Sequence, residues 1–88
     1  MEKVALVTGS SSGIGFETSL ALARNGFHTF ATMRDLSKDE KIKQVIEKED
    51  LSIEILELDV DSKESVNQAI KIILEKKDRI DVLVNNAG

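Results

Sequence analysis

Short apolar runs alternate with helix-like segments along the chain, and this alternation predicts a regular series of strands and helices. The run Val4–Val7 is continuous and apolar, as expected of a strand that is covered on both faces. The pattern is helical over Gly13–Arg24, and Asn25-Gly26 predicts its end, because glycine tolerates the left-handed conformation that closes many helices. Residues 27–33, rich in Phe and Thr, predict a second strand.

The second half of the chain continues the alternation. Ser37 and Glu40 have the spacing of a capping box, and a narrow apolar stripe then predicts a peripheral helix. Residues 53–58 alternate Ile and Leu with glutamate, which predicts a strand at a sheet edge. Asp61 and Glu64 again have capping-box spacing. The strongest helical periodicity of the chain follows, at i, i+3, i+4, i+7 and i+8, in Val66, Ala69, Ile70, Ile73 and Leu74. Residues 80–84 predict a fourth, mostly apolar strand.

The resulting order, β-α-β-α-β-α-β, predicts an α/β fold with a parallel sheet, right-handed crossovers and helices on both faces. In a doubly wound arrangement the strand order is 3-2-1-4. The third strand is then an edge, in agreement with its glutamates, and the apolar first and fourth strands are central. The chain has no proline and no linker-like segment, so we expect one domain over residues 1–88.

Composition excludes several classes of function. The net charge of −4 opposes general affinity for nucleic acid, and three phenylalanines without Trp or Tyr supply few stacking platforms. No apolar run approaches the roughly 20 residues of a membrane span, and the first residues do not resemble a signal peptide. Without cysteine, neither disulfides nor a thiolate metal site can form. We therefore expect a cytoplasmic protein with no membrane or nucleic-acid partner and no metal site.

The segment between the first strand and the first helix reads Thr8-Gly9-Ser10-Ser11-Ser12-Gly13-Ile14-Gly15. Glycines permit a tight turn and let a pyrophosphate approach the backbone N–H groups at the helix N-terminus, where the partial charge is positive. The three serines add hydroxyl donors. Gly-x-Gly-x-x-Gly does not fit, because Thr18 stands where the third glycine would fall, and the Gly-Lys-Ser/Thr of a phosphate loop is missing. A glycine-rich turn without a ligand is the alternative.

Three segments together resemble the short-chain dehydrogenase/reductase family. Thr8-Gly9-x-x-x-Gly13-Ile14-Gly15 resembles the cofactor motif, Leu58-Asp59-Val60 is similar to the adenine-contacting segment, and Asn85-Asn86-Ala87-Gly88 resembles a second marker of the family. The resemblance covers the whole chain but only the first part of a family domain of roughly 250 residues. It implies the N-terminal, NAD(P)-binding half of a Rossmann-type domain.

The resemblance also implies roles for individual residues. The pyrophosphate would be held by Gly9, Ser11, Ser12, Gly13, Ile14 and Gly15. Asp59 would bind the adenine amino group, with a helix-capping carboxylate as the alternative, and the Val60 backbone would contact the ring. The ribose side would be lined by Asn86, Ala87 and Gly88, while Asn85 would be a brace that ties the fourth strand to neighbouring backbone.

In this family, residues at the end of the second strand contact the adenosine ribose and so distinguish NAD from NADP. Met33 aligns with the position of the carboxylate that selects NAD, and Arg34, which follows it, suits the 2′-phosphate of NADP. We therefore expect NADP(H) as the cofactor. NAD is the alternative, because Asp35 lies 20 residues beyond Gly15, near the usual acidic position, and Ser12 replaces a basic residue common in NADP-preferring members. Arg34 could instead be a surface arginine paired with Asp35.

The resemblance implies an oxidoreductase, a homo-oligomer when full length, that transfers a hydride between a small-molecule alcohol and a carbonyl. The family's catalytic tyrosine, lysine and serine lie beyond the marker at residues 85–88, and this chain has no tyrosine. We therefore assign no catalytic residue and expect these 88 residues alone to be inactive. The alternatives are a non-catalytic nucleotide-binding or regulatory module and a pure interaction domain. We interpret His28 as a surface histidine, and Glu47, Glu49 and Asp50 as a solvated helix end without a partner.

Overall fold

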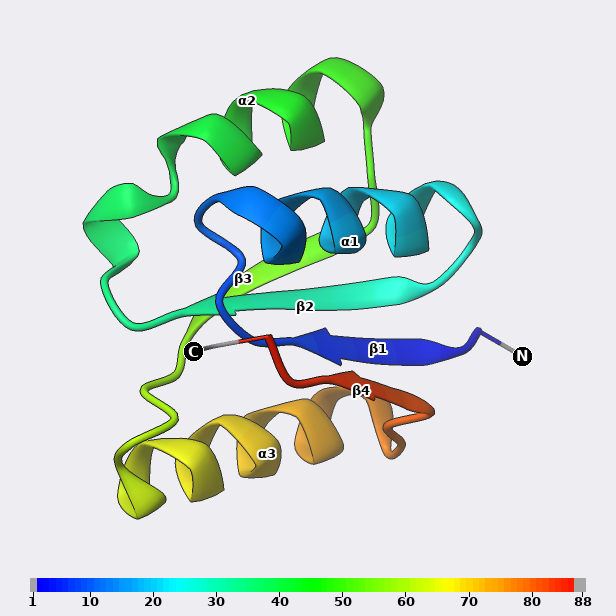
Figure 1. Cartoon of the computed structure of the whole chain (residues 1–88). Coiled ribbons are helices and arrows are strands. Elements are labelled where there is room, and N and C mark those ends of the chain that lie inside the picture. The colour runs from blue at the N-terminus through cyan, green and yellow to red at the C-terminus, as the bar shows by residue number, and fades with distance from the viewer. Residues whose placement is uncertain (1, 87–88) are drawn as a thin grey trace.

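The computed structural model describes residues 2–86 as one parallel sheet covered by helices on both faces (Figure 1). The strand order is β3-β2-β1-β4, which confirms the predicted α/β fold and its 3-2-1-4 topology. In chain order the elements are β1 (Val4–Val7), α1 (Gly13–Arg24), β2 (His28–Met33), the 3₁₀ helix η1 (Leu36–Lys38), α2 (Glu40–Glu49), β3 (Ile53–Glu57), α3 (Lys63–Lys77) and β4 (Val82–Val84).

The helices divide the core into two clusters, one on each face of the sheet. Helices α1 and α2 cover one face and α3 covers the other (Figure 1). The cluster on the α3 side consists of Val4, Leu6, Phe30, Leu58, Ala69 and Ile73. The cluster on the α1 and α2 side consists of Leu20, Ala23, Ala31, Met33, Ile42 and Ile53. Ile42 is the one buried residue of α2, which agrees with the peripheral helix predicted from its narrow stripe.

Burial along the strands follows their place in the sheet. All four residues of β1 are buried between β2 and β4, as its continuous apolar run predicts. Strand β3 is an edge, as expected from its glutamates. Within the described residues β4 forms the other edge and leaves Leu83 62% exposed, as the predicted order 3-2-1-4 implies for a sheet of four strands.

Neither predicted capping box forms. After β2 the chain makes the extra turn η1, so α2 begins at Glu40 and its N-cap is Asp39, whose side chain makes no capping hydrogen bond. Helix α3 is capped by Ser62, which accepts a hydrogen bond from the Ser65 N–H at 3.2 Å, and not by Asp61. Residue spacing predicted a cap near each site, but which residue becomes the cap depends on how the preceding loop leaves its strand.

Two polar groups away from the glycine loop have partners that the sequence did not predict. His28 is no surface histidine: its side chain is 13% exposed, and its Nε2 lies 2.8 Å from Glu54 Oε2 on the neighbouring strand. Glu49 is paired with Arg24 through two hydrogen bonds of 2.8 and 2.6 Å, which link the ends of α2 and α1. Both partners come from elements distant in sequence, so the local sequence pattern could not predict these pairs.

Asp81 fastens β4 to β1 through both its backbone and its side chain. Its N–H donates to the Val4 carbonyl and its Oδ2 accepts from the Val4 N–H, each at 2.8 Å. The hydrogen bond from Arg79, followed by that from Val4, lowers the pKa of the Asp81 carboxyl below its ordinary value. A carboxyl with a lowered folded-state pKa stabilises the fold above the ordinary pKa and loses that contribution as the pH falls through the folded value.

We therefore expect Asp81→Asn to destabilise the protein near neutral pH and to matter less under acid conditions. The measurement is urea unfolding of the wild type and the variant between about pH 6 and about pH 3. The difference in unfolding free energy should shrink once the pH drops below the ordinary aspartate value of 3.8. A difference that stays constant over this range would show that the Asp81 charge does not contribute.

Candidate glycine-loop cavity

The loop between β1 and α1 leaves the N-terminus of the helix open. Gly9 and Gly13 have φ angles of 64° and 63°, in the left-handed region where glycine avoids the strain of a side chain. Ser12 precedes the helix with an extended backbone, and its side chain makes no capping hydrogen bond. The first N–H groups of α1 therefore lack the side-chain acceptor that often occupies such a position, as an anion site requires.

Hydrogen bonds to β1 and β2 hold this loop in place. Ser10 is fully buried, its N–H donates to the Thr32 carbonyl at 2.9 Å, and its hydroxyl donates to the Val7 carbonyl at 3.0 Å. The Thr32 hydroxyl donates to the same carbonyl at 2.9 Å. Ser10 is therefore committed to the fold, and of the three serines expected to supply hydroxyl donors, Ser11 and Ser12 face the cavity.

Gly15 has a packing function that residue spacing did not predict. A Cβ at this position would overlap the Gly9 carbonyl oxygen and would lie 2.7 Å from Asn86 Nδ2. Gly15 is buried and is not among the residues that line the cavity. The missing side chain allows α1 to pack directly against the loop.

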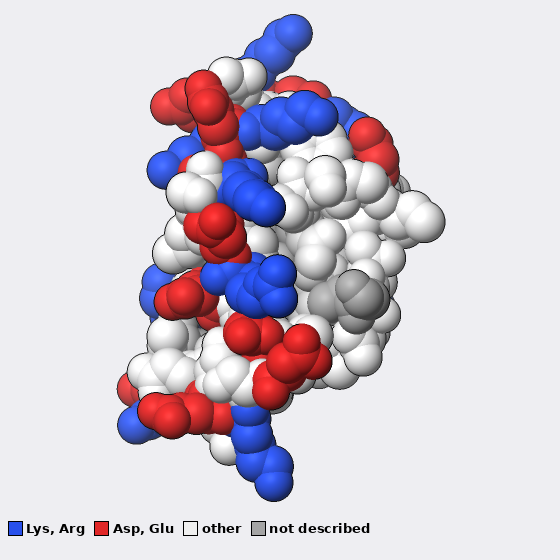
Figure 2. Space-filling model, turned by 60° about the vertical axis from the view of Figure 1, so that its left-hand side comes forward, with Lys and Arg blue, Asp and Glu red and all other residues white. Residues whose placement is uncertain are grey.

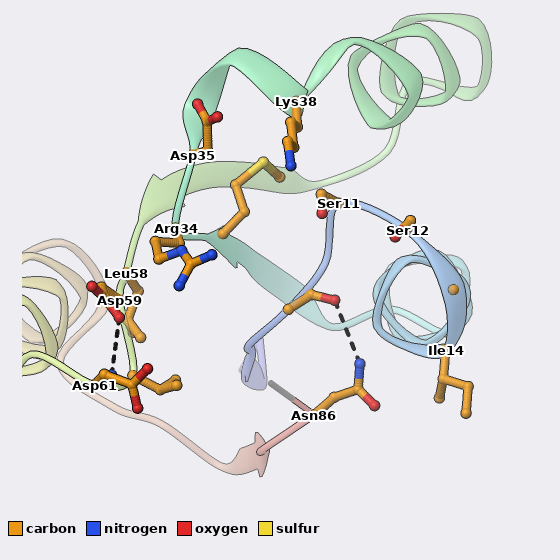
Figure 3. Close-up of a pocket in the computed structure, with 14 residues that line it drawn as sticks. Ser11, Ser12, Ile14, Arg34, Asp35, Lys38, Leu58, Asp59, Asp61 and Asn86 are labelled. Atoms are coloured by element: carbon orange, nitrogen blue, oxygen red, sulfur yellow. Dashed lines mark hydrogen bonds between the residues drawn. The ribbon is translucent and has the colours of Figure 1, made fainter. Parts of the chain in front are cut away.

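The segment after β4 is joined to the loop through Thr8. The Thr8 hydroxyl donates to Asn85 Oδ1 at 3.2 Å and accepts from the Asn86 N–H at 2.9 Å, while the Thr8 N–H donates to the Val84 carbonyl at 3.0 Å. Asn86 Nδ2 in turn donates to the Gly9 carbonyl at 3.4 Å (Figure 3). Asn85 thus braces the end of β4, but through the Thr8 hydroxyl and not through the neighbouring backbone that was expected.

A cavity of about 560 Å³ lies where the carboxyl ends of the strands meet this loop (Figure 3). Its size falls within the range of small-molecule and cofactor sites. The predicted site residues that line it are Gly9, Ser11, Ser12, Gly13, Ile14, Arg34, Asp59, Val60 and Asn86. The remaining lining residues are Met33, Asp35, Lys38, Leu58 and Asp61. Ala87 and Gly88, also predicted, lie outside the described residues.

Asp59 faces the cavity and is not the cap of α3. Its Oδ1 accepts from the Asp61 N–H at 3.0 Å, and its own N–H donates to the Ser65 hydroxyl at 2.9 Å. Ser62 caps the helix instead, so the alternative interpretation of Asp59 as a helix-capping carboxylate is wrong. One carboxylate oxygen of Asp59 accepts no hydrogen bond from the described protein groups.

Two basic residues enter the cavity from the segment after β2. Arg34 makes no ion pair within residues 2–86, so its expected alternative pairing with Asp35 is not found. Asp35 Oδ1 instead accepts from the Ser37 hydroxyl at 2.7 Å and from its N–H at 3.0 Å, and these hydrogen bonds lower the pKa of Asp35. Lys38 was not predicted from the sequence, because Ser37 was interpreted as the cap of a helix and not as part of a separate turn.

Charge elsewhere on the molecule is mixed. On the face of the described residues seen in Figure 2, acidic and basic side chains are interspersed and do not gather into one basic patch. Among residues 2–86 there is no group of three His, Cys, Asp or Glu side chains arranged to hold a metal ion. None of the helices in that range combines the length and apolarity that crossing a bilayer requires.

The chain is similar to known proteins over almost its whole length. The family model for short chain dehydrogenases matches residues 3–88. Short-chain dehydrogenase/reductase prx1 of Penicillium rubens is 51% identical over 89 residues, which are 99% of this chain and 25% of that protein. The chain thus spans about a quarter of the length of this curated relative.

Solved structures with the same fold include two that were determined with a nicotinamide cofactor. An actinorhodin polyketide ketoreductase variant with NADPH superposes with a TM-score of 0.91 at 31% identity, over 99% of this chain and 33% of that one. A metagenomic short-chain oxidoreductase in complex with NADP superposes with a TM-score of 0.90 at 32% identity, over 98% of this chain and 39% of that one. From the matched model, the relative and the shared fold, we conclude that this chain belongs to the short-chain dehydrogenase/reductase family.

Proposed function

We propose that this chain binds NADP(H) and supplies the cofactor-binding half of an oxidoreductase that transfers a hydride between a small-molecule alcohol and a carbonyl. The observation that carries the proposal is that the uncapped N-terminus of α1 and the unpaired Arg34 open into the same cavity. A dinucleotide phosphate carries a diphosphate and a separate 2′-phosphate, so two anion-binding features in one cavity suit its chemistry.

The lining offers partners for the diphosphate, the adenine and the ribose side of the cofactor. The N–H groups around Gly13 and Ile14, with the Ser12 hydroxyl, would hold the diphosphate. Asp59, which keeps a free carboxylate oxygen, would accept from the adenine amino group beside Val60, and Asn86 would contact the ribose side. When bound, the nicotinamide donates or accepts the hydride; the residues described here bind and orient the cofactor.

The surroundings of Arg34 favour NADP(H) over NAD(H). Selection of NAD requires a carboxylate near the adenosine ribose that is able to accept from its 2′-hydroxyl. Met33 has no such group, and the Asp35 carboxylate accepts two hydrogen bonds from Ser37. Arg34, in contrast, has a guanidinium without a carboxylate partner in the described structure and can donate two hydrogen bonds to a phosphate.

We expect Arg34→Gln to weaken NADPH binding by about 10- to 100-fold, because a charge-assisted hydrogen bond contributes about 1.5–3 kcal/mol. NADH binding should change little, since NADH has no 2′-phosphate. The dissociation constants of both cofactors are measured by isothermal titration of the full-length protein. Arg24→Gln is the matched control, because Arg24 is paired with Glu49 and does not line the cavity. Tighter binding of NADH than of NADPH by the wild type, with no effect of Arg34→Gln, contradicts the NADP(H) proposal.

A further inference from the structure

We infer that Ser19 is a positioning residue for the cofactor: its buried hydroxyl fastens α1 to the glycine loop and keeps the helix N-terminus directed toward the cavity. This inference rests on the proposed function, because that function assigns the N-terminus of α1 to the diphosphate. Ser19 lies in the second turn of α1, is fully buried and does not line the cavity. It therefore acts on a bound nucleotide only through the residues that it holds in place.

The Ser19 hydroxyl has two acceptors within reach, one on its own helix and one on the loop. Its Oγ lies 2.9 Å from the Gly15 carbonyl oxygen and 3.1 Å from Ser10 Oγ. A serine hydroxyl has a single proton, and Ser10 donates its own to the Val7 carbonyl at 3.0 Å. Ser10 is therefore the acceptor in its contact with Ser19, and this contact connects α1 with the loop.

Ser10 extends the connection to two strands of the sheet. Its hydroxyl donates to the Val7 carbonyl of β1, and its N–H donates to the Thr32 carbonyl of β2 at 2.9 Å. The Thr32 hydroxyl donates to the same Val7 carbonyl at 2.9 Å. The hydroxyls of Ser19, Ser10 and Thr32 thus form a chain, called here the hydroxyl chain, that joins α1, the loop, β1 and β2.

Burial makes the hydroxyl chain sensitive to the loss of one member. Ser10, Ser19 and Thr32 are each 0% exposed, so solvent cannot replace a lost partner unless the loop or the helix shifts. A buried hydroxyl without a partner costs free energy, and within residues 2–86 every buried side-chain nitrogen and oxygen has a partner. Without the Ser19 hydroxyl, Ser10 would keep its bond to Val7 but lose its side-chain link to α1.

The hydroxyl chain holds residues that are next to the proposed diphosphate site. Ser11 and Ser12, which follow Ser10, line the cavity. Ser19 lies one turn after Gly15 on the same face of α1, so α1 meets the loop through the bare backbone at Gly15 and through a hydroxyl at Ser19. N–H groups that are already in place bind an anion more tightly than groups that must be ordered on binding. Ser19 therefore contributes to affinity by fixing the loop before the nucleotide arrives.

The test is isothermal titration of the full-length protein with NADPH and with NADH, as wild type, Ser19→Ala, Ser10→Ala and the double variant. We expect Ser19→Ala to weaken binding of both cofactors by the same factor, about three- to tenfold, which corresponds to one net hydrogen bond. Both cofactors contain the diphosphate, whereas only NADPH has the 2′-phosphate. The double variant should bind no more weakly than Ser10→Ala, because the two hydroxyls act as one link.

Urea unfolding separates positioning from a general loss of stability. The unfolding curve of Ser19→Ala should change little, because alanine is the better helix former and offsets part of the lost hydrogen bond. Thr29→Val is the matched control: Thr29 is also fully buried and its hydroxyl donates to the Phe27 carbonyl at 3.2 Å, but it does not line the cavity. This control should bind both cofactors with wild-type affinity.

The outcomes separate this inference from the proposed function. If Ser19→Ala binds both cofactors as tightly as Thr29→Val, or if the losses of the two single variants add in the double variant, the role of Ser19 is overturned. A loss confined to NADPH also overturns it, because the effect would then depend on the 2′-phosphate and not on the loop. If the wild type prefers NADH and Ser19→Ala weakens both cofactors equally, the NADP(H) proposal fails and the role of Ser19 stands. A wild type that binds neither cofactor overturns both.

Discussion

Gly15→Ala should destabilise the protein by about 3 kcal/mol, the upper part of the usual range for overpacking, and should strongly weaken nucleotide binding. The added Cβ would overlap the Gly9 carbonyl oxygen and press on Asn86 Nδ2. Neither can yield cheaply, because the Gly9 carbonyl belongs to the backbone and Asn86 is tied to Thr8. Helix α1 must therefore move away from the loop, and its N-terminal N–H groups move with it.

The measurements for Gly15→Ala are urea unfolding and titration with NADPH. Gly26→Ala is the control: Gly26 also has a positive φ, 92°, but a Cβ there would meet nothing within 4 Å. We expect a loss of about 1 kcal/mol for this control, from backbone strain alone, with NADPH binding unchanged. If Gly15→Ala loses no more unfolding free energy than Gly26→Ala, the close contact between α1 and the loop does not contribute to stability as expected.

Phe30→Ala should cost about 3–5 kcal/mol of unfolding free energy, the usual range for truncating a buried aromatic side chain. Phe30 is fully buried on the α3 face of the sheet, among Val4, Leu6 and Ile73. It comes from β2, which hydrogen-bonds to strands on both sides, so the surrounding residues cannot easily collapse into the space. For a protein of ordinary stability this is a large share of the total.

Urea unfolding measures this loss, and Phe27→Ala is the matched control. Phe27 is the same residue type and precedes β2, but it is only partly buried, so a clearly smaller loss is expected. NADPH binding by the folded fraction of Phe30→Ala should remain near the wild-type value, because Phe30 does not line the cavity. Equal losses for the two variants would show that the α3-side cluster does not dominate the stability of the sheet.

Most of the fold was predictable because its signals are local. The apolar run at β1, the glutamates of β3 and the periodicity of α3 each report how a segment is covered, and alternation of the two kinds of segment implies a parallel sheet. The glycine loop was predictable for the same reason, since it lies between a strand and a helix that the pattern already placed. Within the described structure, most residues of the three family motifs line the cavity: Gly9, Gly13, Ile14, Leu58, Asp59, Val60 and Asn86. The exceptions are Thr8, Gly15 and Asn85.

Contacts that depend on a second element were the ones that residue spacing did not predict. The missing side chain of Gly15 allows the approach of α1 to Gly9. The Ser10 hydroxyl was expected to donate a hydrogen bond to a phosphate, but it donates to the Val7 carbonyl. Lys38 was not singled out from the sequence, and the turn after β2 brings it to the cavity.

The sequence by itself determined the order of strands and helices, the position of the glycine loop and the presence of Arg34 after β2. Only the tertiary structure decided which polar groups are consumed by the fold and which face the cavity. The physical reason is that a hydroxyl or carboxylate forms hydrogen bonds with the groups that the surrounding backbone brings within reach. For Ser10, Asp35 and Asp59, that partner is set by how the loops leave their strands and not by residue spacing.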